Sequence, residues 1–260
     1  MHLQPDFIIM STPHHLTFFQ KIRILWAVFL YTLDTSIQST YRGIMGTSNR
    51  RWVDQLLNTW VRRMLKLLQI HCTVHNPKKI KPLAERATII MCNHSSLLDI
   101  PISLTAFPDY SVRMLAKKEM MKIPLMNRGM KAGEFPFIDR KNRQQAICDL
   151  AHVRKLLESG IVMWLAPEGT RSRTQHVGPF KKGAFITAIQ TEAVIIPMAV
   201  RGANNILPPH TLDLKLGQSA EVHVGDIIDT RHYSMDTKDQ LITDVRRVIQ
   251  ALAGETPDII

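Results

Sequence analysis

Short, mostly apolar runs rich in β-branched residues recur through most of this chain, and stretches of a different period separate them. The clearest runs are residues 88–92, 161–165 and 193–200, and two less clear runs are residues 72–74 and 220–224. Runs of about four to eight such residues are typical of strands that are buried on both faces. The sequence therefore predicts a sheet whose central strands are covered on both sides.

Helical stretches alternate with these runs. Residues 144–159 and 183–191 lie between expected strands, and residues 238–253 form a closing helix before Gly254. Strands that alternate with helices are typical of a parallel sheet with helices on its faces. We therefore expect an α/β domain over residues 70–260, with a mostly parallel central sheet flanked by helices.

Residues 1–69 are expected to form two amphipathic helices that precede this domain. The first covers residues 18–38, a turn is expected at 41–49, and the second covers residues 50–69. Large apolar residues of the second helix recur at helical spacing and form one stripe: Trp52, Val53, Leu56, Leu57, Trp60, Val61, Met64, Leu65 and Leu68. Tryptophans beside cations suit a bilayer interface. We expect a two-helix membrane-associating motif; the alternative is that the stripe packs on the core.

The apolar run within the first helix is short. It covers residues 24–33, and Lys21, Arg23 and Asp34 bracket it. A helix needs about 20 apolar residues to span a bilayer. We therefore expect this helix to lie in the interface, with a spanning helix as the less favoured alternative. No signal peptide is expected, because no basic segment precedes the apolar residues 7–10.

The net charge of +11 is concentrated in two places. Residues 1–75 carry eight Lys/Arg and three Asp/Glu, and residues 111–147 carry nine and three. This basicity indicates an acidic partner, such as nucleic acid, an anionic membrane or a phosphorylated substrate. Nucleic acid is the least favoured, because only Phe135 and Phe137 supply aromatic rings in the second segment. We expect an anionic membrane surface and no nucleic-acid partner.

The three cysteines, Cys72, Cys92 and Cys148, have no framework spacing. Such a set indicates reduced thiols and a cytoplasmic compartment. His71, Cys72 and His75 are close in sequence, but no second cluster with zinc-like spacing accompanies them. We therefore expect no metal site.

A polar segment directly follows the strand expected at 88–92, and it contains His94 and Asp99. In open α/β sheets, ligands lie beyond the carboxyl ends of the strands. His94 and Asp99 are five residues apart, so one helix would not place them on the same face. A turn followed by a helix from about Asp99 would bring them together, and Pro101 suits the first turn of that helix. The carboxylate could then hold one imidazole nitrogen, leaving the other as a base; the ordinary histidine pKa of about 6.5 suits that role.

Three further blocks stand out: residues 133–140 and 166–173, which combine polar residues, glycine and proline, and the apolar, proline-containing residues 194–200. The second is the richest in chemistry. Its glycine turn follows a strand and exposes backbone N–H groups, and Arg171 adds a planar guanidinium that matches phosphate. Two simpler interpretations stay open: Glu168 could pair with Arg171, and Arg140 could be a solvated residue at the end of a strand.

Together these blocks resemble the glycerophospholipid acyltransferase superfamily, and within it the lysophosphatidic acid acyltransferases most closely. The matching blocks are His-x4-Asp at His94 and Asp99, Phe-Ile-Asp-Arg at 137–140, Pro-Glu-Gly-Thr-Arg-Ser at 167–172 and Pro-Phe-Lys-Lys-Gly at 179–183. The likeness covers about residues 70–205. It departs from the family pattern at Ala166, where an aromatic residue is common, and at Met198.

The resemblance implies a function and a site. A family member transfers a fatty acyl group from acyl-CoA or acyl-carrier protein to the sn-2 hydroxyl of 1-acylglycerol-3-phosphate, giving phosphatidic acid in phospholipid biosynthesis, with no cofactor besides this co-substrate. His94 would be the general base, and Asp99 would orient it. Lys117 or a backbone N–H group would support the oxyanion. The residues that would hold the substrate phosphate are Glu168, Gly169, Thr170, Arg171 and Arg140.

Several alternatives stay open beside this function. Glycerol-3-phosphate, another lysophospholipid or a lyso-aminolipid would also fit the blocks as acceptor. A covalent acyl-enzyme at Cys92, Ser95 or Ser96 is less favoured, because the sequence has no Gly-x-Ser-x-Gly elbow. The expected partners are a lysophospholipid and an acyl thioester, which acyl-carrier protein could deliver. The expected location is the cytoplasmic face of a membrane, the bacterial inner membrane or its equivalent.

Overall fold

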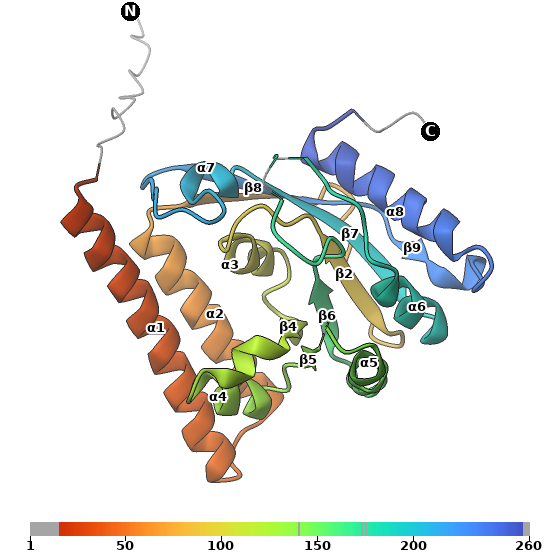
Figure 1. Ribbon diagram of the computed structural model, residues 1–260, viewed down its shortest axis with the longest axis horizontal. Coiled ribbons are helices and arrows are strands. Elements are labelled where there is room, and N and C mark those ends of the chain that lie inside the picture. Colours follow the sequence, from red (N-terminus) through yellow and green to blue (C-terminus); the bar gives the residue numbers. More distant parts are fainter. Residues whose placement is uncertain (1–15, 140, 173, 175, 257–260) are drawn as a thin grey trace, which may run out of the picture.

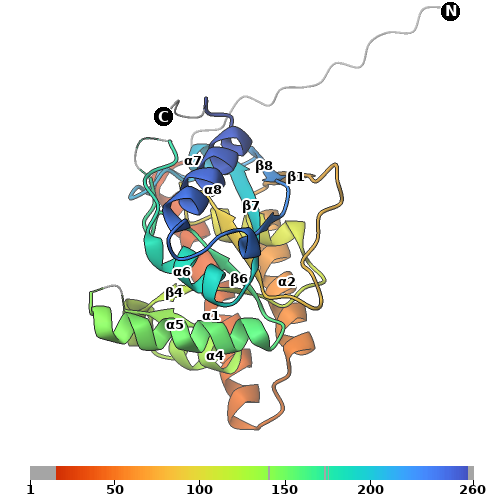
Figure 2. The same ribbon diagram turned by 90° about the vertical axis from the view of Figure 1, so that its right-hand side faces the viewer.

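The computed structural model describes residues 16–139, 141–172, 174 and 176–256. At its centre is a twisted sheet with helices on both faces (Figures 1 and 2). The α/β architecture predicted from the alternating pattern is thus confirmed, and most strand pairs are parallel. Within the described ranges, no helix combines the length and the apolar character needed to cross a bilayer.

The main sheet has the strand order β1-β8-β7-β2-β6-β3, and β9 pairs with β7. The strand bounds are β1 His71–His75, β2 Thr88–Cys92, β3 Val112–Met114, β6 Val162–Leu165, β7 Val194–Arg201, β8 Ser219–Val224 and β9 Ile228–Asp229. β2, β3, β6 and β7 run parallel, whereas β8 and β9 are antiparallel to β7. The carboxyl ends of β2, β6 and β7 therefore meet at one edge, where ligands of such sheets bind.

Helices cover both faces of the sheet. This arrangement suits β2, whose side chains are buried on both faces. The helices are α1 Phe18–Ile44, α2 Arg50–Leu67, α3 Asp99–Ser103, α4 Met126–Ala132, α5 Arg143–Glu158, α6 Lys182–Gln190, α7 Ala203–Ile206 and α8 Lys238–Ala253, with 3₁₀ turns at η1 Leu104–Ala106, η2 Lys118–Lys122 and η3 Thr230–His232. Ile89 and Ile90 are neighbours in β2, and strand geometry points them to opposite faces. Ile90 joins a cluster with α2 and α3, and Ile89 joins one with α5, α6 and α8.

The first helix is longer than the sequence predicts. It continues to Ile44, so the turn expected at 41–49 is shorter. A contact with α4 explains the difference, because a Cβ atom at Gly43 would lie only 2.6 Å from the Cβ of Ala132. Glycine lets the two helices touch here, and this packing outweighs its weak helix propensity.

The segment between β3 and α5 contains elements that the sequence patterns did not predict. A small parallel sheet joins β4 (Ala116–Lys117) to β5 (Phe137–Ile138), and η2 and α4 lie between these strands. None of these elements is longer than seven residues. Elements this short contain too few residues to show a period of 3.6 or 2, so hydrophobic periodicity does not detect them.

The apolar stripe of α2 faces inward. Val53, Val61 and Met64 are buried, and the indole Nε1 of Trp60 donates a hydrogen bond to Thr32 Oγ1 of α1 at 3.2 Å. For these residues the structure shows packing on the core, the alternative to the bilayer contact expected from the two tryptophans. Amphipathic helices of both kinds have the same pattern, so the sequence could not separate them.

A buried ion pair also fixes α2 to the sheet. Asp54 Oδ1 lies 2.7 Å from Arg113 Nη1, and the Arg113 side chain is 0% exposed. Ser111 Oγ donates to Asp54 Oδ2 at 2.6 Å, and Arg113 Nε donates to the carbonyl of Gly133. Burial lowers the pKa of Arg113, and the charge of Asp54 opposes that change. The pair joins α2, β3 and the end of α4 in one packed unit.

α1 lies at one side of the molecule (Figure 1), and many of its apolar side chains are exposed. Those more than 40% exposed are Phe18, Phe19, Ile22, Trp26, Phe29, Leu30, Ile37, Tyr41 and Ile44. Most recur every three or four residues, so they share one face of the helix. We call this surface the α1 stripe. A contiguous exposed apolar surface of this kind is typical of an interaction site.

Candidate active site

His94 lies in the loop that joins β2 to α3. All five residues of β2 are buried, so the loop starts at a rigid point. The side chain of Asn93 fixes that point further: its Nδ2 donates to the carbonyl of Val200 at 3.1 Å, and its Oδ1 accepts from the N–H of Val200 at 2.8 Å. The loop is therefore tied to β7 one residue before His94.

Asp99 is the first residue of α3 and is fully buried, with 0% exposure. Its Oδ2 lies 2.9 Å from His94 Nδ1 and accepts the N–H groups of Ser95 at 2.6 Å and Ser96 at 2.7 Å. Three donors thus converge on one carboxylate oxygen, which fixes the imidazole and the loop together. His94 Nε2 makes no hydrogen bond with any described residue, and the side chain is 17% exposed. The geometry leaves this nitrogen available to a substrate.

The carboxylate of Glu168 also holds the loop that carries His94, through a brace of hydrogen bonds to main-chain N–H groups. Its Oε1 accepts the N–H of His94 at 3.0 Å, and its Oε2 accepts the N–H of Gly178 at 3.0 Å. The N–H of Ser172 donates to the carbonyl of His94 at 2.7 Å. Burial raises the pKa of Glu168, while the two backbone N–H groups oppose that shift. Both main-chain groups of His94 are therefore held by the segment that follows β6.

A second polar surface lies beside this brace, and we call it the Arg171 pocket. It has a volume of ≈ 470 Å³ and includes Thr170, Arg171, Ser172, Lys181 and His210. Gly169 makes the turn that leads into it, with φ 77° and its N–H donating to the carbonyl of Ala166 at 3.0 Å. A guanidinium, an ammonium and hydroxyl groups around one space suit an anion.

No hydrogen bond or ion pair among the described residues joins Lys117 to the site. Lys117 is exposed in β4, just beyond the point where the N–H of Leu115 donates to the carbonyl of Trp164 at the edge of the sheet. Arg140 lies outside the described residues. Its neighbour Asp139 pairs with Lys118 at 3.0 Å. The roles expected for Lys117 and Arg140 stay predictions.

An apolar cavity of ≈ 390 Å³ lies between the helices on the His94 side of the sheet. We call it the helix cavity. Its walls come from α1, α2, α3 and α4, and include Leu25, Val28, Leu57, Met64, Leu97, Leu98, Met114, Met130, Phe135 and Leu207. Leu97 and Leu98 lie between His94 and Asp99 in the chain. The cavity thus reaches the loop that carries the imidazole, and its walls suit a hydrocarbon chain.

The side chains considered for a covalent acyl-enzyme are poorly placed for it. Cys92 is 0% exposed, and burial raises the pKa of its thiol well above the usual range. A thiol of this kind does not ionise near neutral pH and is a weak nucleophile. Ser96 Oγ donates to the carbonyl of Leu207 at 2.8 Å, and Ser95 Oγ lies 3.4 Å from Asp99 Oδ1. None of the three contacts the imidazole nitrogen that could activate it.

One group among the described side chains could hold a metal ion. His75, Glu221 and His223 have ligand atoms within 4.8 Å of one another at the β1–β8 edge of the sheet. The histidine rings stack at 4.5 Å, and Glu221 Oε2 lies 2.8 Å from His223 Nε2. The sequence had drawn attention to Cys72 beside His75, but residues three apart in a strand point to opposite faces. The absence of a metal stays a prediction.

Sequence reasoning did not single out Trp164, Lys181 or His210. The Trp164 ring lies edge-on to His94, with centroids 6.3 Å apart, and is a wall of the site. Its buried Nε1 has no partner among the described atoms. Lys181 sits in the quoted Pro-Phe-Lys-Lys-Gly block, which could have suggested it. His210 follows the last block, so no local signal pointed to it.

The chain is similar in sequence to known acyltransferases. The chain is 30% identical over 187 residues to the acyltransferase acl-2 of Caenorhabditis elegans. The aligned region covers 72% of this chain and 65% of that protein. It is 35% identical over 130 residues to the 1-acyl-sn-glycerol-3-phosphate acyltransferase of Saccharomyces cerevisiae, covering 49% of this chain and 43% of that one. The chain therefore spans less than two thirds of the length of these curated relatives.

A solved structure shares the fold. The 1-acyl-sn-glycerophosphate (LPA) acyltransferase PlsC of Thermotoga maritima superposes with a TM-score of 0.71, at 21% identity, over 90% of this chain and 93% of that one. The family model described as Acyltransferase matches residues 71–201, which run from β1 to the end of β7 and include both His94 and the Arg171 pocket's main loop. With that match over half of its length, this chain belongs to the Acyltransferase family.

Proposed function

We propose that the chain transfers a fatty acyl group from an acyl thioester to the sn-2 hydroxyl of 1-acylglycerol-3-phosphate, making phosphatidic acid. The observation that carries the proposal is the His94–Asp99 pair, in which a buried carboxylate 2.9 Å from Nδ1 leaves Nε2 available as a base. The names of the yeast relative and of the Thermotoga maritima enzyme support the same acceptor.

In the proposed reaction, His94 Nε2 accepts the proton of the sn-2 hydroxyl while the hydroxyl oxygen bonds to the thioester carbonyl carbon. A positioned base of this kind contributes about 10²–10⁴-fold to the rate. The C–S bond then breaks, and the thiolate takes the proton from the imidazolium. The products are phosphatidic acid and a free thiol. Asp99 stabilises the imidazolium between these steps because its carboxylate is fixed against Nδ1.

The Arg171 pocket is the proposed site of the acceptor phosphate. Arg171 offers a planar fork to two phosphate oxygens, Thr170 offers a hydroxyl, and the turn at Gly169 aims the backbone of the loop at the same space. Lys181 adds a second cation. Ser172 lines the pocket, and its N–H donates to the carbonyl of His94 at 2.7 Å. This closeness suits an acceptor whose reacting sn-2 hydroxyl is on the carbon next to the one that bears the phosphate.

The other residues expected around the phosphate take different parts in the proposal. Glu168 acts as a positioning residue, because both its oxygens accept main-chain N–H groups and its charge would repel a phosphate. Arg140 is a further candidate for the phosphate. Lys117, just beyond the sheet edge, is the candidate donor to the oxyanion that forms on the thioester carbonyl.

The helix cavity is the proposed site of an acyl chain. Its walls are almost wholly apolar, and they include Leu97 and Leu98 of the loop that carries His94. Each methylene that leaves water for such a cavity contributes about 0.8 kcal/mol. Binding through the chain would hold the reacting end of the lipid near His94.

We also propose that the α1 stripe lies on an anionic bilayer at the cytoplasmic face. Trp26 and Phe29 stack at 5.2 Å on this surface and are 59% and 49% exposed. Aromatic rings of this kind are enriched at bilayer interfaces. In flotation with phosphatidylglycerol vesicles, Trp26→Ser/Phe29→Ser should lose binding, whereas Ile147→Ser on α5 should not. Equal flotation of both variants would contradict the α1 assignment.

The activity itself is tested by a matrix of acceptors and donors. Purified protein in detergent is given lysophosphatidic acid, glycerol-3-phosphate, another lysophospholipid or a lyso-aminolipid, each with acyl-CoA or acyl-carrier protein. Phosphatidic acid should form only from lysophosphatidic acid. His94→Ala should abolish the product, and His152→Ala, an exposed histidine on α5, should not. Inactivity of the wild-type protein on every pair would refute the proposal.

A further inference from the structure

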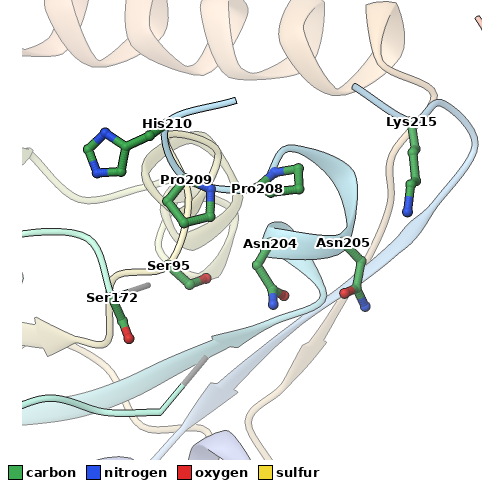
Figure 3. A pocket seen from close by; sticks show the side chains of 8 residues that line it. All are labelled: Ser95, Ser172, Asn204, Asn205, Pro208, Pro209, His210 and Lys215. Carbon is green, nitrogen blue, oxygen red and sulfur yellow. The ribbon is translucent and has the colours of Figure 1, made fainter. Parts of the chain in front are cut away.

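A second polar cavity lies on the other side of Ser172 from the Arg171 pocket, and we call it the polar trough. It has a volume of ≈ 640 Å³, and its polar lining residues are Ser95, Ser172, Asn204, Asn205, His210 and Lys215. Figure 3 shows an extended arrangement, with Ser172 and His210 at one end and Asn205 and Lys215 at the other. Most of the lining comes from the connection between β7 and β8, beyond the quoted sequence blocks.

One end of the trough lies next to the loop that carries His94. Ser95 follows His94 in the chain, and the N–H of Ser172 donates to the carbonyl of His94 at 2.7 Å. Ser172 and His210 also line the Arg171 pocket. The two polar cavities therefore share Ser172 and His210 next to the loop that carries His94, and two polar substrates could reach this loop together.

Four polar side chains of the trough are not used by the fold. Those of Asn204, Asn205, His210 and Lys215 make no hydrogen bond or ion pair with any described residue, and no carboxylate lines the cavity. The nearest acidic residue in the segment, Asp213, pairs with Lys21 of α1 at 2.8 Å. The trough thus offers amides and one unopposed ammonium group, which suits a ligand that has both amide and anionic groups.

The segment that carries these side chains is held in place. The N–H of Lys215 donates to the carbonyl of Ile206 at 2.9 Å, and Leu214 beside it is 2% exposed. The carbonyl of Leu207 accepts from Ser96 Oγ at 2.8 Å, so the segment is joined to the catalytic loop. His210 has φ 62°, a left-handed conformation that non-glycine residues rarely adopt. A preformed cavity loses less freedom when it binds a ligand.

Acyl transfer needs a second substrate of this chemistry. The acyl donors considered above, acyl-CoA and acyl-carrier protein, both present the thioester at the end of a phosphopantetheine arm, which has two amides and, at its far end, a phosphate. We propose that the polar trough binds this arm, with the thioester beside Ser95 and Ser172, the amides facing Asn204 and Asn205, and the phosphate at Lys215. The assignment rests on the proposed acyl transfer.

The assignment of the phosphopantetheine arm is tested with shortened acyl donors as well as with protein variants. Initial rates are measured with lysophosphatidic acid and three donors: acyl-CoA, acyl-phosphopantetheine and acyl-pantetheine, which lacks the phosphate. Lys215→Ala should raise the KM of the first two donors about tenfold, the size expected for one charge-assisted hydrogen bond. With acyl-pantetheine, Lys215→Ala and the wild-type protein should have the same KM. The KM of lysophosphatidic acid should not change.

Two lysines serve as controls. Lys181→Ala, in the Arg171 pocket, should raise the KM of lysophosphatidic acid and leave that of the donor unchanged. Lys155→Ala, exposed on α5 outside both cavities, should leave both unchanged. Binding without turnover gives a second measurement: calorimetry with CoA should show about tenfold weaker binding to His94→Ala/Lys215→Ala than to His94→Ala alone.

The remaining outcomes separate the two proposals. If Lys215→Ala raises the KM of lysophosphatidic acid instead, the trough belongs to the acceptor, and the arm assignment is wrong. An effect seen with acyl-CoA but not with acyl-carrier protein or acyl-phosphopantetheine would place Lys215 on the nucleotide phosphates and would also overturn it. If Lys215→Ala is active and its KM for every donor equals that of the wild-type protein, the arm assignment alone is refuted. If the wild-type protein is inactive with every donor, the proposed acyl transfer is refuted.

Discussion

Replacing Asp99 by asparagine isolates the charge of the carboxylate from its hydrogen bonds. In the wild-type protein, Oδ2 accepts from Ser95 N–H, Ser96 N–H and His94 Nδ1, while Oδ1 faces Ser95 Oγ at 3.4 Å. The asparagine oxygen can take the place of Oδ2, and its amide nitrogen can donate to Ser95 Oγ. Asp99→Asn should therefore keep the imidazole in the same orientation and tautomer.

The expected loss of rate follows from the missing charge. When His94 accepts the proton, an imidazolium forms about 4 Å from the carboxylate, and their attraction at an effective dielectric constant of about 20 is about 4 kcal/mol. Each 1.36 kcal/mol is a factor of ten in rate, so kcat should fall about 10³-fold. Asp99→Ala should lose more activity, because it also frees the ring. It should lower the free energy of unfolding by about 3 kcal/mol, since three buried donors lose their acceptor.

Release of free thiol from acyl-CoA at saturating lysophosphatidic acid gives kcat, and urea unfolding gives stability. Asp109→Asn, an exposed residue of the loop before β3, is the matched control and should behave as wild type. A wild-type kcat in a folded Asp99→Asn protein would refute the reasoning, because it would mean that no imidazolium forms beside Asp99 during the reaction.

Three further predictions concern stability and the thiol. Asp54→Ala leaves the buried Arg113 without its partner and should lower the free energy of unfolding by about 3 kcal/mol, whereas Asp34→Ala breaks an exposed pair and should cost under about 1 kcal/mol; equal losses in urea unfolding would contradict this. Burial raises the pKa of Glu168, so folding favours the protonated carboxyl. The stability that this group contributes is therefore lost as pH rises from about 4.3, the ordinary glutamate pKa, through the pKa of Glu168 in the folded protein. Relative to wild type, Glu168→Gln should therefore gain stability over this range; a constant difference would contradict it. Cys92→Ala should retain activity, since the buried thiol is no nucleophile; complete loss in a folded protein would revive an acyl-enzyme.

The core of the fold follows from sequence patterns because buried strands and long helices have strong local signals. The run at 88–92 is buried at every position, as β2, since helices cover both of its faces. The closing helix, α8, has the expected bounds and ends at Gly254, whose φ of 84° only glycine adopts easily. The antiparallel pairing of β8 with β7 was not predictable, because strand direction depends on the path of the chain between them.

The candidate site was predictable where its residues are close in sequence. His94 and Asp99 share one loop, so spacing and the position of Pro101 sufficed to suggest their pairing. The brace from Glu168 joins residues 74 positions apart, and Lys215 comes near the site only through the turn after β7. Such contacts depend on the three-dimensional path, which a single sequence does not contain.

The helix cavity exists because α1 and α4 meet through small residues rather than through large apolar side chains. Ser39 Oγ donates to the carbonyl of Gly129 at 2.7 Å, and Thr40 Oγ1 donates to that of Leu125 at 3.0 Å. A Cβ atom at Gly129 would lie 2.7 Å from the carbonyl oxygen of Ser36, so only glycine allows this approach. Close contact at this end fixes α1 without filling the space beside it. The same helix can therefore wall an apolar cavity with one face and expose the α1 stripe on the other. With the stripe on a bilayer, as proposed, a lipid chain would reach the His94 loop without a long path through water.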